Sequence, residues 1–261
     1  MAQSENGTHQ ALDRAFELIN LLSSSNSAMT IMEISRALKI TRTTAYAMVN
    51  SLLAQNCLEK DPTSKKYRLG YRFYEIGSQY RYQFPFLNIA EKYINAIFPK
   101  WNMVRINVSV LKPEMMAVIL LSKDSSLIPR MPHGQVLPAQ CSGGGKALLA
   151  SLNPAVIDKW FDSGVKLPAL TPNTITDRKR LHEELALIRS RGYSTEMEEL
   201  SPRRACVGAP IRSMSGETIA AASFATSLQH FQQHQDELID DIVQLTNDIS
   251  GDLGYNLLNR P

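Results

Sequence analysis

Residues 28–70 read AMTIMEISRALKI, TRTTAYAMVNSLLAQNCL and EKDPTSKKYRLG, a stretch that predicts the fold of the N-terminal region. Apolar residues recur at helical spacing in the first two segments, and the third resembles a basic hairpin. The two apolar sets are Ile31, Ile34, Ala37 and Leu38, followed by Ala45, Met48, Val49, Leu52 and Leu53. Two short helices with a shared core and a positive hairpin are typical of a winged helix-turn-helix, so we expect DNA binding.

Both helices have polar residues where a helix should begin. Thr30 with Glu33 three residues later predicts a capping box, and Thr41 can cap the second helix with its hydroxyl. With its apolar stripe turned inward, the second helix presents hydrogen-bonding groups that can meet base edges and phosphates. The residues that we expect to contact DNA from this helix are Thr41, Arg42, Thr43, Thr44, Tyr46 and Asn50.

The segment 59–70 is the expected wing. Asp61 and Pro62 open a turn, and a basic run returns to Leu69. Lysines there would bind phosphates as point charges and so position the protein on the duplex. A solvated surface loop is the alternative for any isolated basic run. The expected contacts of the wing with DNA are Lys65, Lys66, Tyr67 and Arg68.

Charge separates the N-terminal third from the remainder. Residues 1–85 hold ten Lys and Arg against seven Asp and Glu, whereas the whole chain holds 28 against 25, so residues 86–261 carry no net charge. This excess fits a phosphate-binding surface. A length of 261 residues suggests one small and one larger domain.

No apolar run is long enough to span a bilayer, and the polar start MAQSENGTHQ lacks the apolar stretch of a secretory signal. We therefore expect no membrane partner and a cytoplasmic location. Cys57, Cys141 and Cys206 are odd in number and lack metal-ligand spacing, which favours free thiols.

The remaining segments predict an α+β fold. An amphipathic helix over 11–25, with Leu12, Ala15, Phe16, Ile19 and Leu22 on one face, would complete the N-terminal core. A Tyr-rich helix follows the wing, up to Pro85, and either caps a core or forms a dimer contact. Strands joined by turns, with helices grouped between them, then favour an antiparallel sheet flanked by helices. The expected strands are 104–111, 115–121, 192–198, 206–213 and 217–225, and the expected helices are 87–98, 145–152, 155–161, 177–191 and 228–258.

The chain resembles the IclR-type transcriptional regulators over nearly its entire length. The resemblance rests on KKYRLG (65–70), CSGGGKALLA (141–150), LTPNTITDRKRLHEELALIRSRGYSTEMEE (170–199) and CVGAPIRSMSGETIAAASF (206–224), in that order. It implies a DNA-binding domain over 9–70, a linker helix over 71–85, and a GAF- or PAS-like domain over 86–261 that binds a small effector. It also implies homodimers, often paired into tetramers on double-stranded DNA.

The glycine run at Ser142–Gly145 leads directly into a helix, so backbone amides and the positive end of the helix dipole converge there. A carboxylate fits such a position, so we expect a small organic acid as the effector. A phosphate-binding P-loop would need Gly at position 140 and Ser or Thr at 147, where this chain has Gln and Ala. A plain strand-to-helix turn is a further alternative.

By resemblance, the effector pocket includes the backbone at Gly143 and Gly144 and side chains on the later strands. With the adjacent Ser142, the expected effector-binding residues are Ser142, Gly143, Gly144, Glu196, Cys206 and Ser223. This chain departs from the family at Gln140 (commonly His), Glu196 (often Asp) and Ala225 (a hydroxyl residue), and Ala47 replaces a frequent Arg of the reading helix. Neither the acid nor the operator sequence can therefore be transferred from a relative.

Catalytic and metal-binding readings are weaker. His230 and His234 have metal-ligand spacing but lie in a Gln-rich segment without an acidic general base, and no motif places a His near Cys206. Glu196, Glu198 and Glu199 are explained by strand alternation. We expect no catalytic residue, metal or cofactor. The alternative is a small-molecule-binding protein or enzyme whose N-terminal domain makes protein contacts.

Overall fold

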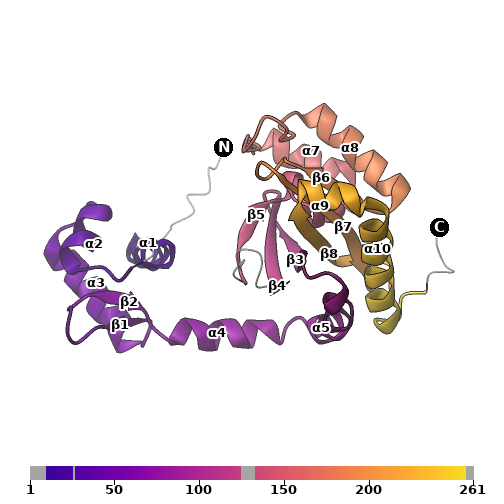
Figure 1. The fold of residues 1–261 in the computed structure, drawn as a ribbon. Coiled ribbons are helices and arrows are strands. Elements are labelled where there is room, and N and C mark those ends of the chain that lie inside the picture. Colours follow the sequence, from indigo (N-terminus) through magenta and orange to yellow (C-terminus); the bar gives the residue numbers. More distant parts are fainter. Residues whose placement is uncertain (1–9, 26, 125–132, 257–261) are drawn as a thin grey trace. The chain divides into compact units, whose positions relative to one another are not determined.

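The computed structural model describes residues 10–25, 27–124 and 133–256. The chain forms two compact units, one ending at Phe84 and the other beginning at Pro85 (Figure 1). Residue 9 of the expected DNA-binding domain, the polar start and residues 257–261 of the expected effector domain lie outside the described residues.

The N-terminal unit is helical with one small hairpin. Its elements are α1 (Gln10–Ser24), α2 (Ile31–Ala37), α3 (Arg42–Ala54), β1 (Leu58–Lys60), β2 (Tyr67–Leu69) and α4 (Arg72–Arg81). β1 and β2 are antiparallel, with Leu58 opposite Leu69. The buried core joins α1, α2, α3 and the hairpin through Leu18, Leu22, Ile31, Ile34, Ala45, Val49, Leu58 and Tyr67. This arrangement is the predicted winged helix-turn-helix.

The predicted caps of α2 and α3 are confirmed. The Thr30 amide donates to Glu33 Oε2 at 2.7 Å while the Glu33 amide donates to Thr30 Oγ1 at 3.3 Å, which is a complete capping box. Thr41 Oγ1 accepts from the Thr44 amide at 3.2 Å. Local side-chain bonds to the first free amides thus determine where both helices begin.

The predicted inward face of α1 is partly wrong. Leu12 and Phe16 are about 60% exposed, whereas Leu18 and Leu22 are buried. The buried stripe is centred on Leu18 because only the second half of α1 packs on the other helices. A helix of 15 residues can bury such a stripe and leave other apolar side chains in solvent.

The C-terminal unit contains one six-stranded antiparallel sheet in the order β5-β4-β3-β8-β7-β6 (Figure 1). Its strands are β3 (Arg105–Lys112), β4 (Met116–Lys123), β5 (Val136–Pro138), β6 (Ser194–Met197), β7 (Arg204–Arg212) and β8 (Thr218–Ser227). The helices are α5 (Phe86–Ile97), η1 (Phe98–Lys100), η2 (Ala139–Cys141), α6 (Gly143–Ala150), α7 (Pro154–Asp162), α8 (Arg178–Arg191), α9 (Leu228–Gln233) and α10 (Gln235–Asp252). The α+β class with an antiparallel sheet is as predicted.

Helices cover both faces of this sheet. Ser223 and Phe224 are neighbours on β8 and so point to opposite faces. Ser223 faces the start of α6, while Phe224 packs near Trp101, whose indole donates to Asp241 of α10 at 2.8 Å. α6 and α10 therefore lie on opposite faces, and the polar face under α6 is the one that can hold a site.

Two sequence predictions need correction in this unit. The predicted closing helix is broken at His234, whose φ of −128° and ψ of 25° are not helical, and continues as α10. The His234 ring packs edge-on against Trp101, which supports the change of direction. The short strand β5 was not predicted because three residues are too few to show a period.

Candidate DNA interface and effector pocket

The outer face of α3 carries the expected DNA-reading residues. Thr41, Arg42, Thr43, Tyr46 and Asn50 are all exposed. Thr44 is half-buried, and its hydroxyl lies 2.9 Å from that of Thr41 within the cap. The buried residues of α3 are Ala45 and Val49, so the polar face is directed to solvent and can reach the groove of a duplex.

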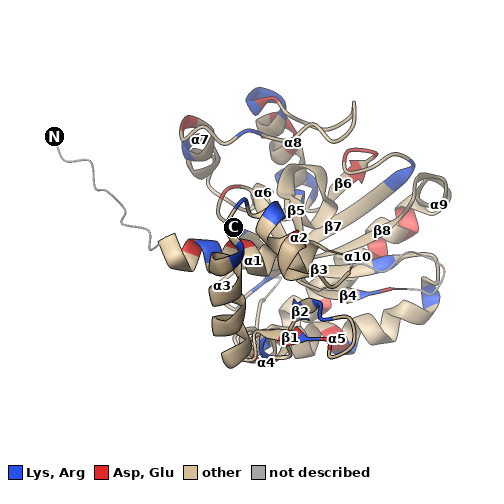
Figure 2. Cartoon of the chain, turned by 90° about the vertical axis from the view of Figure 1, so that its left-hand side faces the viewer, with Lys and Arg blue, Asp and Glu red and all other residues tan. Residues whose placement is uncertain are grey.

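Figure 2 shows both signs of charge on the hairpin. Lys65 is exposed, Lys66 is half-buried, and Arg68 pairs with Glu59 at 2.9 Å with 67% of its side chain exposed. Asp61 Oδ1 accepts from the amides of Thr63 and Ser64, and these bonds hold the pKa of Asp61 below its usual value. The turn is therefore built by an acidic side chain, and its positive charge comes from the residues that follow.

Tyr67 does not belong to the exposed set. Its side chain is only 3% exposed and forms part of the N-terminal core. Its backbone pairs with Met29 through bonds of 2.9 and 2.7 Å, which direct the ring inward. The expectation that Tyr67 contacts DNA with its side chain is wrong, because strand alternation places it on the buried side of β2.

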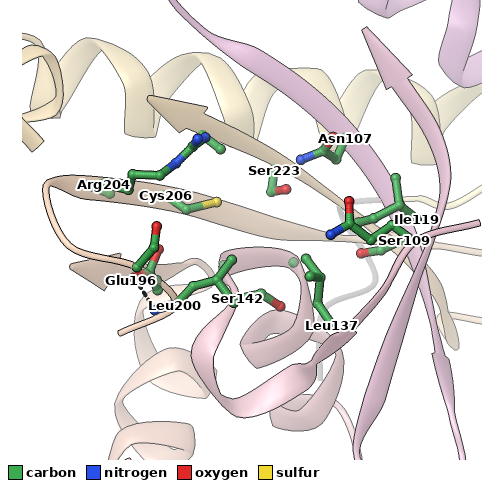
Figure 3. A pocket seen from close by; sticks show the side chains of 16 residues that line it. Asn107, Ser109, Ile119, Leu137, Ser142, Glu196, Leu200, Arg204, Cys206 and Ser223 are labelled. Atoms are coloured by element: carbon green, nitrogen blue, oxygen red, sulfur yellow. Dashed lines mark hydrogen bonds between the residues drawn. The ribbon is translucent and has the colours of Figure 1, made fainter. Parts of the chain in front are cut away.

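The C-terminal unit holds a cavity of about 240 Å³ between the start of α6 and the sheet (Figure 3). The structure brings all the residues expected at the effector site to its wall, namely Ser142, Gly143, Gly144, Glu196, Cys206 and Ser223. Arg204, Cys206 and Glu196 lie at one end, and Ser109, Ile119 and Leu137 lie at the other (Figure 3).

Glycines allow α6 to approach the sheet at this cavity. A Cβ on Gly144 would lie 2.6 Å from Ser109 Oγ, and one on Gly143 would lie 2.7 Å from Cys206 Sγ. Ser142 caps the helix by accepting from the Gly145 amide at 3.1 Å. The first amides of a helix have no acceptor within it. The Gly143 amide is directed at the Cys206 thiol, so the Gly144 amide is the one that can meet an anion in the cavity.

Glu196 and Cys206 are buried groups with perturbed acidity. Glu196 Oε1 accepts from the amides of Glu199 and Leu200 at 2.6 and 3.1 Å, yet burial raises the pKa of this carboxyl to about 7. Burial also raises the pKa of the Cys206 thiol to about 12. A thiol that stays protonated is a poor nucleophile, so Cys206 is suited to lining the wall.

Lys146 forms a buried ion-pair cluster that sequence reasoning missed. Its side chain is 1% exposed, and Nζ lies 2.6 Å from Glu199 Oε1 and 3.3 Å from Glu184 Oε1. Burial raises the pKa of Glu199, although Lys146 opposes this shift. Gln140 is also buried, and its Oε1 has no partner among the described residues. A lysine inside the apolar helix GGGKALLA was the available signal.

Asn107, Ser109 and Arg204 also line the cavity and were not predicted. Arg204 lies two residues before Cys206 on β7, and Asn107 pairs with Ser223 across β3 and β8. Residues two apart share one face of a strand, so period-2 spacing from Cys206 could have identified Arg204.

His230 and His234 lie close together, with ring centroids 4.6 Å apart, and burial lowers the pKa of His230. In the described part of the chain, no group of three His, Cys, Asp or Glu residues could hold a metal ion. None of the described helices is long and apolar enough to cross a membrane.

A winged helix-turn-helix joined to an α+β unit, whose cavity is lined by both polar and apolar residues, defines the class of ligand-responsive transcription factors. The chain belongs to the IclR family of bacterial transcriptional regulators. The family model described as "Bacterial transcriptional regulator IclR C-terminal" matches residues 86–251, and the "IclR helix-turn-helix domain" model matches residues 11–62. The protein is therefore a transcriptional regulator with a C-terminal effector-binding domain.

Known proteins support this assignment over almost the whole chain. RhmR of Escherichia coli K12 is 30% identical, with 94% of each chain covered, and BhcR of Paracoccus denitrificans is 26% identical, covering 96% of this chain and 89% of BhcR. Both are named as HTH-type transcriptional regulators. Thermotoga maritima IclR superposes with a TM-score of 0.77 at 25% identity, covering 94% of this chain and 99% of the other.

A Microbacterium hydrocarbonoxydans IclR homologue has the same fold, with a TM-score of 0.81 at 22% identity and with 93% of this chain and 98% of the other covered. That homologue was crystallised in complex with 4-hydroxybenzoate.

Proposed function

We propose that the protein binds a specific double-stranded operator and changes its affinity when a small organic acid occupies the pocket under α6. Residues 9–70 would form the DNA-binding domain, 71–85 the linker helix and 86–261 the effector-binding domain. The protein would act as a repressor or activator without catalytic activity. The observation that carries this proposal is that α3 has an exposed polar face while the other unit contains a cavity lined by polar and apolar residues.

The exposed face of α3 supports sequence reading. Arg42 and Asn50 have side chains that form bidentate contacts with guanine and adenine edges, and Thr41, Thr43 and Tyr46 add hydroxyl groups. Thr44 belongs to the same set, because it lies in the first turn of α3 beside Thr41. Lys65, Lys66 and Arg68 of the hairpin would contact phosphates, which fixes the position of α3 without adding specificity.

The pocket supports an acid as the effector. Gly144 offers its amide at the positive end of α6, and Ser142, Cys206 and Ser223 add weak or neutral polar groups. Glu196 can accept a ligand hydroxyl or, when protonated, donate to an oxygen. The carboxylate 4-hydroxybenzoate bound to the Microbacterium homologue is compatible with this chemistry.

A homodimer or homotetramer belongs to the proposal, because paired reading helices recognise two half-sites about one helical turn apart. An acid that binds one arrangement of the dimer more tightly would shift the population toward it and alter DNA affinity. A regulator of chromosomal genes must share the compartment of the DNA, which is the cytoplasm.

The competing reading is an enzyme or small-molecule-binding protein whose N-terminal unit makes protein contacts. The Cys206 thiol, with its pKa of about 12, supplies no ready nucleophile for such chemistry. The relatives described above are named as transcriptional regulators. We therefore retain the regulator as the proposal.

The test is DNA affinity over a salt series, using a duplex that the protein itself selects from a random pool. Affinity should fall steeply as salt rises, because each phosphate contact releases counterions. Replacing Lys65, Lys66 and Arg68 together by Gln should weaken binding and reduce the logarithmic salt slope by about 3 for each protomer bound to the duplex. The matched control replaces the exposed Lys159, Lys166 and Lys179 of the C-terminal unit by Gln and should leave the slope unchanged. Failure to select any duplex, or equal slopes for both triple variants, would refute DNA reading by this surface.

A further inference from the structure

The Arg204 guanidinium is a cation of the pocket that forms no ion pair with a carboxylate of the described residues. Arg204 is half-buried and lines the cavity at the end that also contains Glu196. Among the described residues, no carboxylate oxygen lies within 4.0 Å of its nitrogens. The nearby Asp124 already pairs with Arg105 on β3. Arg204 thus brings a positive charge to the pocket wall that no carboxylate of the described residues pairs with.

Leaving this charge unpaired is unfavourable. Burial is the main cause that lowers the pKa of Arg204, and the neighbouring Arg105 adds repulsion. Arginine remains protonated in proteins, so the positive charge persists despite this cost. An anion delivered by the ligand would compensate both the lost hydration and the repulsion, and it would form charge-assisted hydrogen bonds.

The pocket contains a second position for an anion. The amides of Gly143 and Gly144 lie where α6 meets Gly208, since a Cβ on Gly208 would be 2.7 Å from the Gly144 nitrogen. Arg204 precedes Gly208 by four residues on β7, which corresponds to about 13 Å between their Cα atoms. The amides lie on the α6 side of the cavity and the guanidinium comes from β7, so they mark two separate places around a single small cavity.

Resting on the proposed function, we propose that the effector is a short dicarboxylic acid, with one carboxylate on the Gly144 amide at the start of α6 and the other on Arg204. Arg204 is then the residue that selects for the second acid. Leu200 supplies apolar surface for the methylene chain between the carboxylates. Glu196, whose pKa is raised to about 7, can retain a proton and donate it in a hydrogen bond to the carboxylate on Arg204.

Calorimetric titration of the full chain with chain-matched acids tests this selectivity. The probes are succinate, glutarate and adipate, each compared with butyrate, valerate or hexanoate of equal length. The wild-type protein should bind at least one diacid about tenfold to a hundredfold more tightly than its monoacid, which is the ratio typical of a charge-assisted hydrogen bond. Arg204→Gln should reduce that ratio to about one and leave monoacid affinity unchanged within about threefold.

Arg203→Gln is the matched control, since Arg203 is an exposed neighbour that does not line the cavity, and it should retain the wild-type ratio. Equal affinity of the wild-type protein for diacids and monoacids would overturn the proposal while leaving acid sensing intact. This measurement uses only the wild-type protein, so it does not depend on whether a variant folds. A preserved ratio in Arg204→Gln would also overturn it. Absence of binding by every acid would refute the acid-sensing part of the proposed function as well, whereas selection of a DNA duplex would still identify the regulator.

Discussion

Glu196 and Glu199, two buried glutamates three positions apart, illustrate how single residues set the charge in and around the effector pocket. Glu199 has a direct ionic partner in Lys146 at 2.6 Å, whereas Glu196 is held by two backbone amides. Burial raises the pKa of both carboxyls, because neither set of partners replaces the water that each group loses. The protonation state of Glu196 therefore changes near neutral pH, inside the cavity itself.

Stability should depend on pH through Glu196. Its pKa rises from 4.5 in the unfolded chain to about 7 in the folded protein, so the folded state binds the Glu196 proton more tightly. The stabilisation of the folded state that results is fully present below pH 4.5 and is lost as the pH rises through 7. Glu196→Gln removes this dependence. Urea unfolding should show that, from pH 5 to pH 8, the free energy of unfolding of the wild type falls by about 2 to 3 kcal/mol relative to that of Glu196→Gln. The exposed Glu217→Gln control should show no such change, and an equal pH response in wild type and Glu196→Gln would contradict the assignment.

At the level of elements, the pocket depends on how closely α6 lies against β7. Gly208 permits this approach, because a Cβ there would be 2.5 Å from the carbonyl carbon of Gly143. Ser194 on β6 donates its hydroxyl to the Gly143 carbonyl and so ties the same turn to the sheet. The position of the free amides is thus determined by backbone packing between a helix and a strand.

Gly208→Ala should therefore destabilise the C-terminal unit. Added volume with no space to receive it costs about 1 to 3 kcal/mol, because backbone atoms must move apart. The control is Gly251→Ala on α10, where nothing lies within 4 Å of the added Cβ and where the helix should gain about 0.5 to 1 kcal/mol. Urea unfolding monitored by Trp fluorescence measures both changes. A neutral Gly208→Ala would show that α6 does not pack on β7 as described.

The molecule as a whole consists of two units that each bury a core of their own. The N-terminal core is built around Leu18 and Ile34, and the C-terminal core includes Leu149 and Leu185. The last helix of the N-terminal unit, α4, has no buried residue. The two units are therefore suited to separate tasks.

Limited tryptic digestion should separate these tasks. Cleavage at Arg72 or Arg81 of α4 should yield a stable C-terminal fragment, because few contacts protect this helix from local unfolding. The fragment should keep the thermal shift that an organic acid produces in the intact protein, and it should lose DNA affinity. Mass spectrometry of the fragments and melting curves with and without acid provide the readouts. Degradation without a domain-sized fragment would contradict the independence of the C-terminal unit.

The sequence by itself determined the features that depend on near neighbours. Thr30 with Glu33, the cap at Thr41 and the turn from Ser142 into α6 are short-range arrangements, and the residues needed for them lie within a few positions of one another. Family-like blocks added the order of the domains. These features could be predicted because their energetic partners are adjacent in the chain.

Only the tertiary structure decided which side chains face inward across the units. Tyr67 is buried where its backbone pairs with that of Met29. Lys146 can be buried because its ammonium group pairs with the carboxylate of Glu199, which is 53 positions later in the sequence. Leu12 and Phe16 remain exposed because no other element of their unit covers that side of α1. Arg204 lies in the pocket because β7 pairs between β6 and β8. Burial and charge pairing are properties of contacts between distant segments, and those contacts exist only once the chain has folded.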